Sequence, residues 1–241
     1  MVLSVVFTMG LGLSLTLNPN VLPWYGIALA VLACAAVPYL LHSLPNYDFS
    51  GYRLILPAAL ALASPQVAHA LSVGPFRLLG VFAPGALLYG LILAESFLIR
   101  NSEDETGQAA RLLLTIGAYT VALVVFLLLY AGKERALISS TVAVLLGAGV
   151  SLRLYVLDGV ERGRALASAV VTGVVVGEVL WPLNYWLLGI TAGGIALLLC
   201  LYVLVGILRQ IQAGHLTQAE VLEWVTVSAA GLAVVFGASR I

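Results

Sequence analysis

Residues 170–188, with the sequence VVTGVVVGEVLWPLNYWLL, decide the fold class of this protein. A helix needs about 20 predominantly apolar residues to cross the ~30 Å hydrocarbon core of a bilayer, and this run meets that requirement. Its one ionisable residue, Glu178, lies in the middle third of the run. The stretch therefore predicts a transmembrane helix that carries an acidic side chain at membrane depth.

A stripe of small residues runs along the same predicted helix. Ala165, Ala169, Gly173 and Gly177 recur at every fourth position, so they lie along one helix face. Small side chains allow two helix backbones to approach closely in a membrane. This small-residue stripe predicts a helix-packing face, and a second interpretation makes it a docking surface for another subunit or a second copy of the chain.

Glu178 is the centre of the binding site that the sequence predicts. Trp181, Pro182 and Tyr185 follow it at i+3, i+4 and i+7, and Asn184 continues the line of the small residues. Pro182 has no N–H, so the Glu178 carbonyl loses its helical partner. In hydrocarbon the carboxyl must find partners or stay protonated. We expect an inward-facing site of Glu178, Trp181, Asn184 and Tyr185; the alternative is a neutral Glu178 that only bonds a neighbouring helix.

The composition excludes a soluble fold. The 241 residues are 62% hydrophobic and 9% charged, and the mean hydropathy is +1.09. A soluble protein of this length needs far more polar surface. With 11 basic and 11 acidic residues the net charge is zero, which does not favour nucleic acid as a partner. Cys34 and Cys200 lie in apolar runs, and no cofactor motif or metal-ligand spacing is recognised.

The apolar runs predict an all-α, polytopic transmembrane bundle of about nine spans that forms one membrane domain over residues 1–241. The N-terminal run lacks a basic segment and a cleavage signature, so we interpret it as the first span. The expected spans are 2–17, 23–42, 53–72, 75–99, 109–130, 134–157, 165–187, 189–209 and 218–237.

The basic residues predict the orientation. With nine spans, seven arginines fall on the side of the N-terminus and four basic residues on the other, so the N-terminus is expected in the cytoplasm and the C-terminus outside. Glu95 and Arg153 lie near helix ends and are expected to reach the headgroups. The seven are Arg53, Arg100, Arg111, Arg153, Arg162, Arg164 and Arg209, and the four are Arg77, Lys133, Arg135 and Arg240.

The third predicted span carries a second polar group. Gln66 and His69 lie at i, i+3 on one helix face. The nine-span arrangement puts His69 in the same half of the membrane as Glu178, where the two residues could relay protons or hold a cation. The alternative is that Gln66 and His69 bond to helix carbonyls.

Two segments carry a family resemblance. Residues 177–186 (GEVLWPLNYW), the following Gly193-Gly194 and Tyr202, and residues 52–57 (YRLILP) resemble an uncharacterised family of bacterial multi-pass membrane proteins of unknown function. The resemblance implies a bacterial cytoplasmic membrane and no particular activity.

Three functional hypotheses follow. The first is a small-solute or proton-linked carrier or binder centred on Glu178. The second is an accessory or structural subunit of a membrane protein complex. The third, an intramembrane enzyme acting on a lipid, is disfavoured because no nucleophile–base pair can be assembled from adjacent positions.

Overall fold

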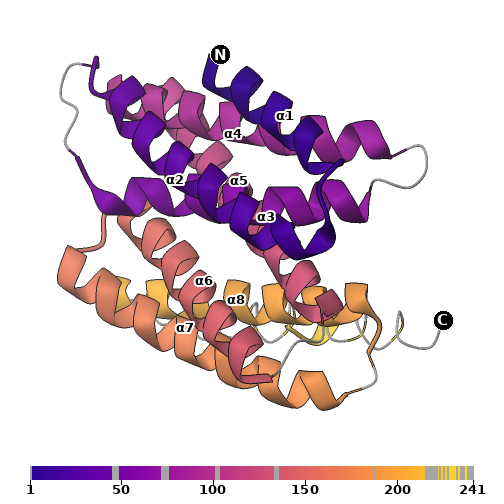
Figure 1. Cartoon of the computed structure of the whole chain (residues 1–241). Helices are drawn as coiled ribbons and strands as arrows, with labels where there is room; N and C mark the ends of the chain where they lie inside the picture. The colour runs from indigo at the N-terminus through magenta and orange to yellow at the C-terminus, as the bar shows by residue number, and fades with distance from the viewer. Residues whose placement is uncertain are drawn as a thin grey trace. The chain divides into compact units, whose positions relative to one another are not determined.

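The computed structural model describes residues 2–44, 49–71, 76–100, 104–132, 136–186 and 188–214, with helical positions at 222, 224, 226, 228–231, 233 and 237. Every regular element in these ranges is a helix (Figure 1), which confirms the all-α class. The elements are α1 (Val2–Ser14), η1 (Pro19–Val21), α2 (Leu22–Leu41), η2 (Gly51–Leu54), α3 (Ile55–Ala70), α4 (Arg77–Arg100), α5 (Glu105–Gly132), α6 (Ala136–Leu157), α7 (Arg162–Tyr185) and α8 (Ile190–Ala213).

Among the described helices, six are long and apolar enough to cross a membrane: α2, α4, α5, α6, α7 and α8. Helix α1 has 13 residues and α3 has 16, or about 20 and 24 Å at ~1.5 Å per residue, less than a bilayer core. The predicted third span is shortened because its first residues form the 3-10 turn η2. The predicted ninth span lies mostly outside the described residues.

Two compact units make up the chain, Met1–Val121 and Ala122–Ile241. Unit 1 contains α1–α4 and the first part of α5, and unit 2 contains the end of α5 and α6–α8. In unit 1, glycines set the close helix approaches. A Cβ added to Gly26 of α2 would lie 2.7 Å from the Leu62 carbonyl oxygen of α3, and one added to Gly85 of α4 would meet the Thr8 hydroxyl of α1. These contacts are the small-residue packing that membrane helices use.

Unit 2 is built on the pair α6 and α7. A Cβ added to Gly147 of α6 would lie 3.2 Å from the Gly173 Cα of α7, so the two backbones nearly touch. Helix α8 packs on both, and Leu180, Leu197 and Leu201 are fully buried in this core. This arrangement brings the end of α6, the start of α7 and the end of α8 together.

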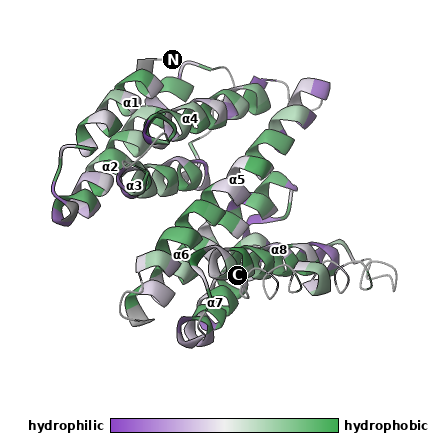
Figure 2. Cartoon of the chain, turned by 90° about the vertical axis from the view of Figure 1, so that its right-hand side faces the viewer, coloured by the Kyte–Doolittle hydropathy of each residue, from purple (hydrophilic) through white to green (hydrophobic). Residues whose placement is uncertain are grey.

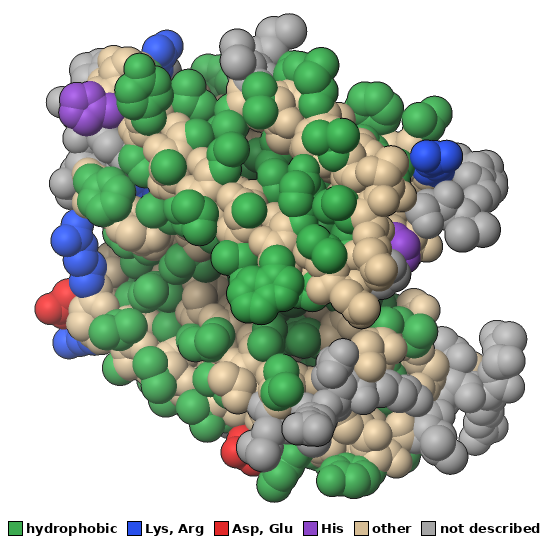
Figure 3. Space-filling view, viewed as in Figure 1, with side chains coloured by type: hydrophobic (Ala, Val, Ile, Leu, Met, Phe, Trp, Pro, Cys, Tyr) green, Lys and Arg blue, Asp and Glu red, His purple; other side chains and the backbone are tan. Residues whose placement is uncertain are grey.

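Apolar side chains dominate the outward surfaces as well as the cores. Hydropathy stays high along the helices and falls near many of their ends (Figure 2). On the face shown in Figure 3, hydrophobic side chains are widespread and charged side chains lie toward the margins. Large residues such as Leu145 and Tyr39 are 68% and 82% exposed. So much exposed apolar surface requires an apolar medium or protein partners.

Candidate functional site

The small-residue stripe lies against α6 of the same chain. Ala165, Ala169, Gly173 and Gly177 are all buried. A Cβ added to Gly173 would lie 2.5 Å from the Val144 carbonyl oxygen, and one added to Gly177 would lie 3.1 Å from the Ser140 carbonyl oxygen. Helix α6 therefore already occupies the face that the sequence also offered to another subunit.

Glu178 is exposed on the surface of α7, not directed inward as expected from the sequence. Helix α6 covers Gly173 and Gly177, while Thr172, Val176 and Leu180 are buried on the adjoining face. Glu178 falls outside both faces because it lies about 100° round the helix from Gly177. No hydrogen bond or ion pair joins Glu178 to any described residue.

The other α7 residues of the predicted site do not gather round Glu178 into a cavity. Trp181 and Tyr185 are 48% and 80% exposed. Asn184 is half-buried, and its Nδ2 has no hydrogen-bond partner in the described part of the chain. Tyr130 of α5 lies close by, and its hydroxyl is 3.0 Å from the Leu183 carbonyl oxygen. This end of α7 is thus held by Tyr130 and presents its aromatic side chains outward.

Gln66 and His69 lie on α3 in unit 1, and both are half-buried. With its amide nitrogen oriented toward the carbonyls, Gln66 donates to the Leu62 and Ala63 oxygens at 2.6 and 3.0 Å. His69 Nδ1 has no partner among the residues described. The pairing of His69 with Glu178, which belongs to unit 2, stays a prediction.

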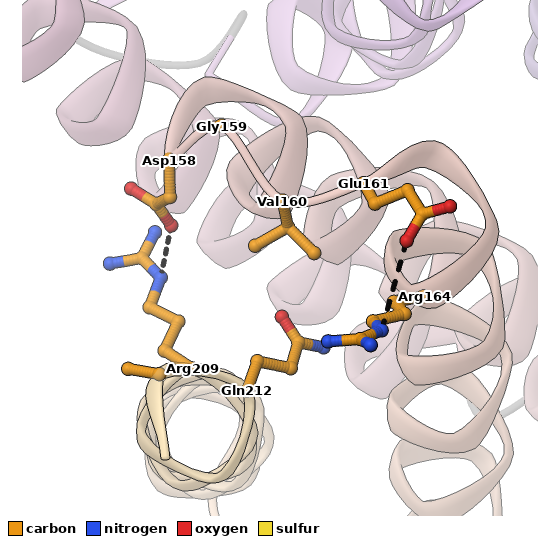
Figure 4. A pocket seen from close by; sticks show the side chains of 8 residues that line it. Asp158, Gly159, Val160, Glu161, Arg164, Arg209 and Gln212 are labelled. Carbon is orange, nitrogen blue, oxygen red and sulfur yellow. Dashed lines mark ion pairs between the residues drawn. The ribbon is translucent and has the colours of Figure 1, made fainter. Parts of the chain in front are cut away.

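The structure places a polar pocket of about 440 Å³ at the α6–α7 turn, beside the end of α8. We call it the α6–α8 pocket (Figure 4). Gly159 allows the tight turn because its φ of 79° is unfavourable for other residues. Gly214, with a φ of 73°, ends α8 in the same way. The lining residues are Asp158, Gly159, Val160, Glu161, Arg164, Arg209, Gln212 and Ala213.

Two ion pairs of different character lie in the α6–α8 pocket. Arg209 Nε of α8 is 2.5 Å from Asp158 Oδ2 at the end of α6, and both side chains are about two-thirds buried. Arg164 Nε is 3.8 Å from Glu161 Oε2, and both side chains are more than 70% exposed. The first pair ties α8 to the turn, whereas the second is loose and well solvated.

A polar ladder leads from the pocket into the core of unit 2. Gln212 Nε2 donates to Ser168 Oγ at 2.5 Å. One turn further along α7, Thr172 Oγ1 lies 3.1 Å from the Tyr155 hydroxyl of α6, and both residues are fully buried. This ladder of Gln212, Ser168, Thr172 and Tyr155 extends the polar surface of the pocket between α6, α7 and α8.

Two polar residues inside apolar helices are the sequence signal for this site. Ser168 lies between one and two helical turns after the start of α7, and Arg209 lies about one turn before the end of α8. Successive helices reverse direction, so these positions meet at one end of unit 2. Among the described residues, no group of three His, Cys, Asp or Glu side chains could hold a metal ion.

The two ion pairs should differ in a double-mutant cycle. Combining Asp158→Asn with Arg209→Met should give a coupling energy of about 1 kcal/mol, because the pair is partly buried and joins two helices. Glu161→Gln with Arg164→Met should give at most about 0.3 kcal/mol. Both cycles are measured from reversible unfolding in detergent micelles. Equal coupling energies would contradict the distinction between a fixed pair and a loose one.

Comparisons with known proteins identify a family but no function. No curated protein and no solved structure matches the chain. A family model described as "Protein of unknown function (DUF5656)" matches residues 3–238, nearly the whole sequence. This confirms the expectation of an uncharacterised family. The protein with this α6–α8 pocket belongs to the DUF5656 family.

Proposed function

We propose that this chain is an integral protein of a bacterial cytoplasmic membrane and binds a small zwitterionic solute or headgroup in the α6–α8 pocket. The observation that carries the proposal is the pocket itself, where three helix ends bring together a fixed and a loose ion pair. Six long apolar helices and the exposed apolar side chains support the lipid bilayer as the surrounding medium. The arrangement of nine membrane spans that the sequence predicts is also part of this proposal.

The basic residues support a cytoplasmic position for the pocket. In unit 2, the described arginines lie near the end of α6, the start of α7 and the end of α8, and they are Arg153, Arg162, Arg164 and Arg209. Cytoplasmic loops are enriched in Lys and Arg. Of the four basic residues expected on the opposite side, Lys133, Arg135 and Arg240 lie outside the described residues.

The charge arrangement supports a ligand that carries both signs. Arg164 and Glu161 can separate at little cost because their ion pair is long and solvated. Arg164 would then bind an anionic group of the ligand and Glu161 a cationic one, so neither charge is left uncompensated. Asp158 and Arg209 stay paired and keep α8 on the turn.

Calorimetric titration of the detergent-solubilised protein tests this proposal. Ethanolamine phosphate carries both charges and should bind at least about tenfold more tightly than ethanolamine or inorganic phosphate. Arg164→Gln and Glu161→Gln should each remove that advantage, whereas Arg100→Gln, an exposed arginine of α4, should not. The proposal fails if inorganic phosphate binds as tightly as the zwitterion, or if neither pocket variant changes binding.

The exposed Glu178 supports a second candidate function, that of a subunit in a membrane complex. A proton-linked carrier centred on Glu178 needs this carboxyl to line a cavity. An outward carboxyl on an apolar helix needs a protein partner instead. Glu178→Gln should leave solute binding in the pocket unchanged if the two sites are independent.

A further inference from the structure

We propose that α7 pairs with α7 of a second copy of this chain, with Glu178 facing Glu178 across a two-fold axis. The inference rests on the proposed membrane location but not on the ligand of the α6–α8 pocket. It also does not use the small-residue stripe, which α6 covers.

The outward face of α7 has the spacing of a helix-pairing seam. Its members are separated by four, three, four, three and four residues, which is the heptad pattern of left-handed helix pairs. All of them are exposed, while the residues that contact α6 and α8 lie on the other side of the helix. Membrane helix pairs commonly use this geometry, with crossing angles of about 20°. The outward seam consists of Ala167, Val171, Val174, Glu178, Trp181 and Tyr185.

Glu178 makes this seam unsuited to face lipid. It lies 14 residues beyond Arg164, or about 21 Å along a helix that crosses a ~30 Å core. The described arginines of unit 2 lie toward the opposite end of α7, and no described residue bonds to Glu178. Because an ionisable side chain exposed to hydrocarbon is costly, Glu178 favours a protein partner on this face of α7.

A second copy supplies that partner without further assumptions. Copies of a membrane protein share one orientation, so a two-fold axis between them runs along the membrane normal and residues of equal depth meet. A protonated carboxyl carries one donor and one acceptor, so two of them across the axis satisfy each other with two hydrogen bonds. A different protein would need its own hydrogen-bonding group at the same depth.

Cysteine cross-linking in membranes tests the pairing. In a background with Cys34→Ala and Cys200→Ala, Val174→Cys lies in the outward seam, one turn from Glu178. Leu145→Cys on α6 is the matched control, because Leu145 and Val174 each lie 12 residues from the end of their helix at the α6–α7 turn (157 − 145 and 174 − 162). Both side chains are exposed, at 68% and 45%. Oxidation should give a disulfide-linked dimer with Val174→Cys and little with Leu145→Cys.

Substitutions at Glu178 then distinguish the contribution of its hydrogen bonds to dimerisation from the contribution of the apolar residues in the seam. Glu178→Gln keeps a self-complementary group and should retain the cross-link, whereas Glu178→Leu should weaken dimerisation about tenfold. Size-exclusion profiles check that each variant is folded. If the Glu178→Leu variant does not fold, the cross-linking of the Glu178→Gln variant tests the proposal. No dimer with Val174→Cys, equal dimer at both positions, or unchanged cross-linking in a folded Glu178→Leu variant would overturn the proposal. Pocket titrations on the same samples show separately whether solute binding survives.

Discussion

Gly173→Ala is expected to lower the free energy of unfolding by about 1–3 kcal/mol, although alanine is the better helix former. The new Cβ would lie 2.5 Å from the Val144 carbonyl oxygen and 2.8 Å from the Ala148 backbone nitrogen. Both are backbone atoms of α6, so relief requires the two helices to separate and to lose contacts along the whole stripe. Unfolding in mixed detergent micelles measures the loss.

Gly163→Ala is the matched control for this change. Gly163 also lies on α7, but a Cβ there would meet nothing within 4 Å. Removing glycine from an open helical position should stabilise the protein by up to about 1 kcal/mol. If the two variants shift stability in the same direction, the α6–α7 contact is looser than the structure shows.

Tyr130→Ala should lower the free energy of unfolding by about 3–5 kcal/mol. Tyr130 is 1% exposed, and its ring packs directly on Gly193 of α8. A Cβ added to Gly193 would lie 2.6 Å from three atoms of the Tyr130 ring. Its hydroxyl also lies within 3.1 Å of the Leu183 and Trp186 carbonyl oxygens at the end of α7. One side chain therefore joins α5, α7 and α8.

Tyr130→Phe separates the two contributions of this residue. It keeps the packing and removes the hydroxyl, so we expect a loss of about 1–2 kcal/mol. Tyr39→Ala, at an 82% exposed position on α2, should change stability by less than about 0.5 kcal/mol. If Tyr130→Ala costs no more than Tyr39→Ala, Tyr130 is not the centre of this contact.

The helices could be predicted from the sequence because membrane-length apolar runs are long and sharply bounded. Periodicity also placed Ala165, Ala169, Gly173 and Gly177 on one face, and in the structure this face is buried on α6. Whether the neighbouring face of α7, which carries Glu178, points inward or outward could not be predicted from this periodicity. Glu178 is only one position from Gly177, and sequence spacing alone does not say where the contact with α6 ends.

The polar pocket was missed for a related reason. Asp158 and Arg209 lie 51 residues apart (209 − 158), and each belongs to a helix end where a polar residue is ordinary. Only the return of α8 to the α6–α7 turn brings them into contact. Glu95 and Arg153 were also placed wrongly: they were expected to reach the headgroups, but they are only 3% and 2% exposed.

The most direct test of this account is the labelling of the two ends of α7 from one side of the membrane. Glu161→Cys at the α6–α8 pocket and Gly189→Cys beyond the other end are both exposed positions, and each is placed in the cysteine-free background. A membrane-impermeant maleimide should label Gly189→Cys in intact spheroplasts and Glu161→Cys only after permeabilisation. Labelling of both positions in intact spheroplasts would contradict the account, because α7 would then not cross the membrane.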